Sequence, residues 1–186
     1  MSIKQKKHKL GAISMRGRMA FTIMCVEAFL VKLYPDRDWT IIAEKMWQST
    51  TTWWIEWTSM YCCFIPDVFL QYQEYDSKGI GKYLTEKEFF QLKELYNGIT
   101  DGIEDDPNDP INYMLSKPFE IATIYENSGI DDGSGSYELI AEAENILTKY
   151  GIELPDYRQV VFSSFDQLEG WGDLFDGRFL SIILNK

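Results

Sequence analysis

Residues 16–34 read RGRMAFTIMCVEAFLVKLY, and this stretch decides the fold class. Its apolar residues recur at spacings of three and four positions, at Met19, Ile23, Val26 and Leu30. That spacing is typical of one face of an α-helix. Because Pro35 cannot continue a helix, the sequence predicts a helix from about residue 16 to residue 34.

Three further helices are expected directly downstream. Asp38 is placed to cap a second helix that runs to about Ser49. A third helix is expected over residues 51–64, and because it is apolar on nearly all sides we expect it to be the central helix. Pro66 then opens a short helix, since proline is tolerated in a first turn.

The strongest local signal is the hexapeptide LTEKEF at residues 84–89. Thr85 is placed to cap a helix, and Glu88 to reach back to it as the partner in a capping box. Leu84 and Phe89 are spaced as a hydrophobic staple across the same helix start. The pattern predicts a helix from residue 86 to about residue 97.

Two helices are expected in the second half of the chain. Residues 111–126 have helical spacing, although Pro118 must kink or split that helix. Ser136 is expected to cap a helix over residues 137–150. Gly151 stands where a helix end favours a left-handed residue.

The C-terminal region has no clear periodicity. Residues 160–162 are compatible with a short strand, and several glycines after residue 169 interrupt regular structure. We therefore predict a mainly α protein with a single helical domain at residues 15–186, containing about six to eight helices and an irregular C-terminal cap. Residues 1–14 are expected to form a basic, mobile tail.

Charge is divided unevenly along the 186 residues. Residues 1–99 carry 13 Lys and Arg against 11 Asp and Glu, whereas residues 100–186 carry 5 against 18. Like-charge repulsion opposes binding of such an acidic block to nucleic acid or to an anionic membrane. It favours a basic partner instead.

Acidic residues of the second half are the candidate partner-binding residues, because several of them lie in loops. A basic protein would be steered towards such a surface. A plain solubilising role for the same charges is the alternative. The candidates are Asp101, Glu104, Asp105, Asp106, Asp109, Asp131, Asp132, Glu138 and Glu142.

The sequence offers little for catalysis. His8 is the single histidine and lies among lysines, which argues against mechanisms that need a positioned imidazole. Cys25, Cys62 and Cys63 lie in apolar stretches, where cysteine usually acts as a small buried hydrophobe, as in a reducing cytosol. No stretch approaches a bilayer span. We expect a cytoplasmic protein that is not an enzyme and has no cofactor.

The main alternative is an enzyme whose active site is built from carboxylates. Neither acidic loop of the second half fits a calcium-binding frame, so no metal site is assigned there. Glu27 and Glu56 each lie among apolar residues of an expected helix. Together they could serve a small metal-dependent hydrolase, although a structural role for each, such as a pairing with arginine, is favoured.

The tryptophan-rich segment offers another candidate binding feature. Trp53, Trp54 and Trp57 lie within five residues and cannot all face the core. One of them, for which we choose Trp54, is expected to reach the surface as an aromatic anchor for a partner. A non-catalytic subunit of a larger cytoplasmic assembly, with this helix as its interface, is therefore a further alternative.

A wider pattern of spaced residues resembles the immunity proteins of bacterial polymorphic toxin and contact-dependent inhibition systems. In the second half it comprises Leu154-Pro155, Phe162, Phe165 and Gly170-Trp171-Gly172-Asp173-Leu174-Phe175-Asp176-Gly177. In the first half it comprises Arg18-x-x-Phe21, Cys25-Val26-Glu27, Trp39, Trp47 and Leu84-Thr85-x-x-x-Phe89.

This resemblance implies a small, mainly helical cytoplasmic protein that binds and neutralises a toxin. Combined with the charge, it predicts an inhibitor that covers the active site of a basic toxin, for example a nuclease, with an acidic surface. The resemblance supplies no contact residues. Gly170, Trp171, Gly172 and Phe175 are expected to act as structural determinants of the C-terminal turn.

Overall fold

The structure is a computed structural model that describes residues 9–102, 109–125, 130–131 and 133–186. Within these residues it contains seven α-helices, several 3-10 turns and no strand, so the mainly α prediction is confirmed. The α-helices are α2 (Met15–Leu33), α3 (Thr40–Trp47), α4 (Trp54–Tyr61), α5 (Pro66–Phe69), α6 (Glu86–Tyr96), α7 (Pro110–Thr123) and α8 (Ser136–Lys149).

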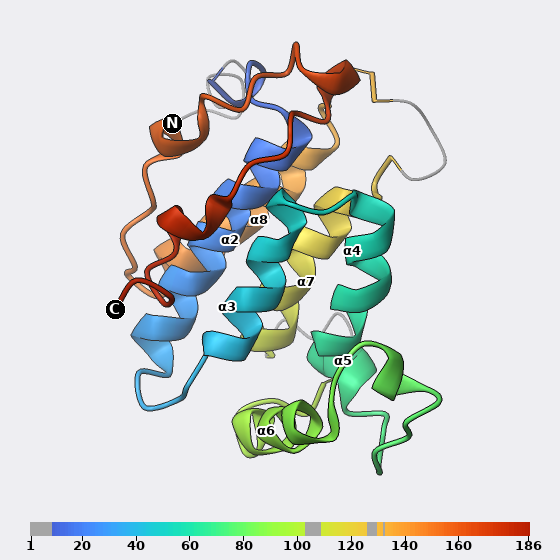
Figure 1. The fold of residues 1–186 in the computed structure, drawn as a ribbon. Coiled ribbons are helices and arrows are strands. Elements are labelled where there is room, and N and C mark those ends of the chain that lie inside the picture. Colours follow the sequence, from blue (N-terminus) through green and yellow to red (C-terminus); the bar gives the residue numbers. More distant parts are fainter. Residues whose placement is uncertain (1–8, 103–108, 126–129, 132) are drawn as a thin grey trace.

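Helix α2 is the central helix of the fold. Every residue from Met15 to Glu27 is buried, and the helix packs against both α7 and α8 (Figure 1). The expectation that the Trp-rich helix would be central is wrong. Helix α4 is only eight residues long, and Ile55 and Glu56 on it are exposed.

Polar residues on α2 are buried because the fold supplies partners for them. The Arg18 guanidinium donates to the carbonyl of Gly133 and to the Ser136 hydroxyl, and lies 5.1 Å from the centre of the Phe165 ring. Buried charge is tolerated only with such compensation. The part of α2 from Met15 to Glu27 can therefore be enclosed on all sides.

Helix α6 lies across the end of the bundle, below α3 in Figure 1. Its predicted capping box is present: Thr85 Oγ1 accepts from the Glu88 N–H at 3.2 Å, and Glu88 Oε2 accepts from the Thr85 N–H at 2.6 Å. The observed bounds agree with the predicted ones to within one residue. Local signals suffice here, because both partners lie in the same turn.

Helices α7 and α8 differ in detail from their predictions. Pro118 lies inside α7, and the helix is not split there. Ser136 is the first residue of α8 rather than its cap, because its hydroxyl donates to the Gly133 carbonyl. Gly151 has the expected left-handed conformation, with φ of +64°.

The C-terminal layer, residues 152–186, wraps over α2 through 3-10 turns: η4 (Tyr157–Val160), η5 (Leu168–Gly170) and η6 (Gly177–Leu180). Residues 160–162 form part of such a turn and not a strand. The turns η4 and η6 begin alike, with Asp156 and Asp176 each accepting from the backbone N–H two residues later. An Asp-x-Arg motif therefore starts both turns, a repeat that sequence reasoning missed.

The predicted boundary between tail and domain is too late. Leu10 is 6% exposed and Ile13 is fully buried, and Ile13 forms an isolated antiparallel bridge with Ser164. Residues 10–14 therefore belong to the packed body. Residues 1–8 lie outside the described part of the chain.

In the described ranges no helix is both long enough and apolar enough to cross a bilayer.

Candidate functional site

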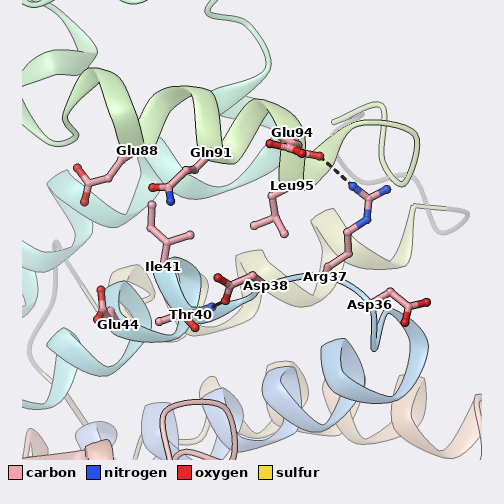
Figure 2. Close-up of a pocket in the computed structure, with 10 residues that line it drawn as sticks. All are labelled: Asp36, Arg37, Asp38, Thr40, Ile41, Glu44, Glu88, Gln91, Glu94 and Leu95. Carbon is pink, nitrogen blue, oxygen red and sulfur yellow. Dashed lines mark hydrogen bonds between the residues drawn. The ribbon is translucent and has the colours of Figure 1, made fainter. Parts of the chain in front are cut away.

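An acidic cleft of about 620 Å³ lies between α3 and α6 (Figure 2). It is formed by the turn after α2, one side of α3 and the facing side of α6. Five of its ten lining residues are acidic and one, Arg37, is basic. The lining residues are Asp36, Arg37, Asp38, Thr40, Ile41, Glu44, Glu88, Gln91, Glu94 and Leu95.

Arg37 forms hydrogen bonds with backbone, and its single positive charge does not balance the five carboxylates of the cleft. Its guanidinium donates from Nη1 to the Glu94 carbonyl oxygen at 2.9 Å and from Nη2 to the Asn97 carbonyl oxygen at 3.0 Å. These carbonyls end α6, where a cation is favourable. Arg37 thus fastens the turn after α2 to the end of α6 and holds the cleft's two walls together (Figure 2).

Two of the cleft carboxylates are held in the charged form by local hydrogen bonds. Asp38 Oδ1 accepts from the Thr40 N–H at 3.0 Å, and hydrogen bonding by Thr40 lowers the pKa of Asp38. Partial burial acts to raise the pKa of Glu88, but hydrogen bonds from Thr85 and the charge of Lys45 lower it overall. Both groups remain anionic at neutral pH.

The cleft combines this charge with an apolar floor. Ile41 is half-buried and Leu95 is 6% exposed, and both lie between the acidic side chains in Figure 2. A lysine or arginine side chain has matching chemistry, because its aliphatic stem can cover apolar surface while its charged head meets carboxylates. The cleft is therefore suited to basic side chains from a partner.

Two of the acidic residues predicted from sequence, Asp109 and Glu142, have partners within the fold. Asp109 is buried and caps α7, accepting from the Asn112 N–H and from the Thr100 hydroxyl. Glu142 forms an ion pair of 2.8 Å with Lys117, which is 3% exposed. Because Asp109 is buried and caps a helix, direct binding of a partner by Asp109 is not supported. Glu142 is engaged by Lys117.

Of the other predicted acids, Asp101, Asp131 and Glu138 are exposed. Glu138 lies in the first turn of α8, at the end of the bundle opposite α6 (Figure 1). Glu104, Asp105, Asp106 and Asp132 lie outside the described residues.

The proposed carboxylate pair of Glu27 and Glu56 does not come together as a buried site. Glu27 is fully buried, but Glu56 is exposed on α4. Glu27 Oε1 accepts from Trp47 Nε1 at 2.8 Å and from the Ser181 hydroxyl at 2.6 Å, while Oε2 accepts from the Ile182 N–H at 2.7 Å. Among the described residues, no group of three or more His, Cys, Asp or Glu side chains is arranged to hold a metal ion.

The exposed tryptophan is Trp53 and not Trp54. Trp53 is 55% exposed, whereas Trp54 is half-buried and stacks on Trp171, with ring centres 5.2 Å apart and planes within 4°. Trp54 therefore contacts the C-terminal layer, because stacked aromatic faces stabilise each other.

The Gly-Trp-Gly turn is in contact with the start of α2. Gly170 and Gly172 have φ of +93° and +85°, which favour glycine. Arg16 Nε donates to the Gly172 carbonyl at 3.3 Å, and a Cβ at Gly172 would collide with the Ser14 hydroxyl. The Phe175 N–H donates to the Thr50 carbonyl at 2.9 Å. These contacts attach the C-terminal layer to the bundle.

Sequence reasoning missed the cleft because its acids are scattered among lysines in the first half of the chain. Two of these acids, Asp38 and Glu88, have a local sequence signal, and that signal indicates a helix start and not a binding site. A comparison with protein-family models, with curated proteins and with solved structures gives no match for this chain.

Proposed function

We propose that this chain is a non-catalytic immunity protein that binds a basic protein toxin and neutralises it by occlusion. The observation that carries the proposal is the cleft between α3 and α6, with five carboxylates around an apolar floor. A toxin that acts on nucleic acid has a cationic surface that attracts phosphate. An acidic cleft would compete for that surface.

Electrostatics of the cleft support a fast association. Asp36, Glu44 and Glu94 are exposed at its rim, and none of their carboxylates is in an ion pair with a residue of the described chain at 4.0 Å or less. Charges of this kind steer a basic partner and set its orientation. The net charge of −11 adds a long-range attraction that salt screens. The resemblance to immunity proteins supports the same function.

The experiment compares two variants that remove three negative charges each. The cleft variant combines Asp36→Asn, Glu44→Gln and Glu94→Gln. Its matched control, Asp101→Asn, Asp131→Asn and Glu138→Gln, neutralises the exposed acids that the sequence predicted. Tagged wild-type protein first captures partners from the cell that makes it, at low and moderate salt, and mass spectrometry identifies them.

The captured protein is then purified, and its association with all three forms is measured. We expect a basic toxin in equal stoichiometry, an association rate about ten-fold lower for the cleft variant, and a smaller change for the control. Coexpression with wild type should relieve the toxin's effect on growth. Equal rates for wild type and the cleft variant, at low salt, would contradict the proposal for the cleft.

A second candidate function is that of a subunit in a larger assembly, because apolar residues are exposed at the start of α4. Trp53 and Ile55 are 55% and 60% exposed. Large exposed apolar side chains that lie together often mark protein interfaces. This candidate predicts aggregation of the isolated chain, relieved by Trp53→Ser with Ile55→Ser. A monodisperse monomer would contradict it.

A further inference from the structure

Cys62 and Cys63 form an adjacent pair of thiols in the 3-10 turn η2 (Cys62–Phe64), which joins α4 to α5. Their sulfur atoms lie 4.0 Å apart and share a hydrogen bond. None of the three cysteines, all of which are in the described chain, forms a disulfide. The pair is therefore available as two thiols side by side.

The two thiols differ in their access to solvent. Cys63 is 5% exposed, whereas Cys62 is half-buried and lines a cleft of about 380 Å³ together with Asp67, Asn112 and Ser116. Cys62 thus departs from the expectation that all three cysteines act as buried hydrophobes. A small reagent in the cleft meets Cys62, whereas Cys63 does not line the cleft.

The two thiols also differ in pKa. The hydrogen bond from the Cys63 thiol lowers the pKa of Cys62 to about 7, although burial and the charge of Asp67 oppose the change. The same pairing, together with burial, raises the pKa of Cys63. The pairing therefore favours the thiolate, which is the nucleophilic form, at Cys62 rather than at Cys63.

We propose that Cys62 is a reversible oxidation site for hydrogen peroxide and that Cys63 is its resolving thiol. The Cys62 thiolate attacks one peroxide oxygen, the O–O bond breaks, and the hydroxide that leaves takes up a proton to become water. The product is a Cys62 sulfenic acid. The Cys63 sulfur then attacks the Cys62 sulfur, and the second water leaves with the Cys63 proton. Two thiols and one peroxide thus give one disulfide and two waters.

The disulfide formed in this way is easily reduced. A trans peptide holds adjacent Cα atoms about 3.8 Å apart, which is shorter than the separation of about 4.4–6.8 Å usual for a disulfide. Strain of this kind makes a disulfide more oxidising and more labile. Oxidation of Cys62 is therefore reversed by an ordinary thiol reductant.

The test exposes the folded full-length protein at pH 7 to a small molar excess of hydrogen peroxide and follows the intact mass. We expect the wild type to lose about 2 Da, with the bond mapped to Cys62 and Cys63, and dithiothreitol to restore the original mass. Alkylation of Cys62 before oxidation should be about five-fold faster in the folded protein than in urea, because its thiolate fraction is larger.

Two variants separate the roles of the thiols. Cys63→Ser keeps a hydrogen-bond donor but cannot condense, so a sulfenic acid should accumulate at Cys62 and react with dimedone. Cys62→Ser should show no oxidation at position 63, because Cys63 is buried and protonated. Failure of peroxide to modify Cys62 would overturn the proposal. Direct conversion of wild-type Cys62 to sulfinic acid would overturn the resolving role of Cys63.

Discussion

Replacement of Glu27 by alanine is expected to loosen the C-terminal layer from α2 and to destabilise the whole protein. The Glu27 carboxylate is the shared acceptor for Trp47, at the end of α3, and for Ser181 and Ile182, which lie 154 and 155 residues further along the chain. No local interaction substitutes for it. The variant Glu27→Ala removes the acceptor while leaving all three donors in place.

The magnitude follows from the donors that lose their acceptor. A buried donor left without an acceptor costs about 1–3 kcal/mol. The Ser181 hydroxyl can rotate to a new acceptor, whereas the Trp47 indole N–H is buried and fixed, and the Ile182 backbone N–H is fixed but only partly buried. We therefore expect a loss of about 4 kcal/mol, a large part of the ~5–15 kcal/mol by which domains are stable.

Urea unfolding followed by tryptophan fluorescence measures this loss, and Glu56→Ala is the matched control. Glu56 is a glutamate on α4 and is exposed, so its replacement should change stability by less than about 1 kcal/mol. Amide hydrogen exchange should show faster exchange of residues 177–186 in Glu27→Ala alone. Equal losses in the two variants would refute the assigned role of Glu27.

The free energy of unfolding should also depend on pH through Glu27. Burial raises the pKa of Glu27, and the hydrogen bonds from Ser181, Trp47 and Ile182 offset only part of that rise. The folded state then binds the proton more tightly than the unfolded state, whose pKa is about 4.5. The stability contributed by the protonated group is therefore present in full below pH 4.5 and is lost as the pH rises through the folded pKa. Glu27→Gln should abolish this decline, and an unchanged pH profile would contradict it.

Two further predictions concern a glycine of the C-terminal layer and the cap of α6. Gly172→Ala should destabilise the protein by about 3 kcal/mol, because a Cβ there collides with the Ser14 hydroxyl and a left-handed alanine is itself unfavourable. Gly151→Ala is the control, because Gly151 has the same kind of φ but open space around it, and it should cost only about 1 kcal/mol. Thermal unfolding of the two variants checks this, and equal losses would refute the collision. Thr85→Ala should cost about 1 kcal/mol by removing the cap of α6, and Thr85→Ser should restore most of it, as measured by urea unfolding. A loss that serine does not restore would argue against the cap.

The accuracy of the sequence predictions depended on how far apart the deciding residues are. The bounds of α2 and α6 were predicted well, because apolar spacing, Pro35 and the Thr85–Glu88 box lie within the helices or beside them. The choice of central helix failed. The polar residues of α2 broke its apolar pattern, yet their partners, such as Gly133 and Ser181, lie more than a hundred residues away.

The cleft between α3 and α6 was also not predicted, because its residues are far apart in the sequence. Counting charges along the chain pointed to the second half, but the acids of the cleft all lie in the first half, at residues 36–44 and 88–94. They form a site only because α6 lies across the end of α3 and Arg37 fastens the turn to it. The distribution of charge along the sequence does not predict that these acids lie close together in space.

The sequence by itself determined the helical class, the start of α6, the left-handed end of α8 and the overall negative charge. Each of these follows from residues within a few positions of one another, or from composition alone. Tertiary structure alone decided that α2 is central, that Glu27 joins the C-terminal layer to the bundle, and that five separate carboxylates line one cleft. The physical reason is that burial and electrostatic potential depend on distances in space, which packing sets between residues far apart in the chain.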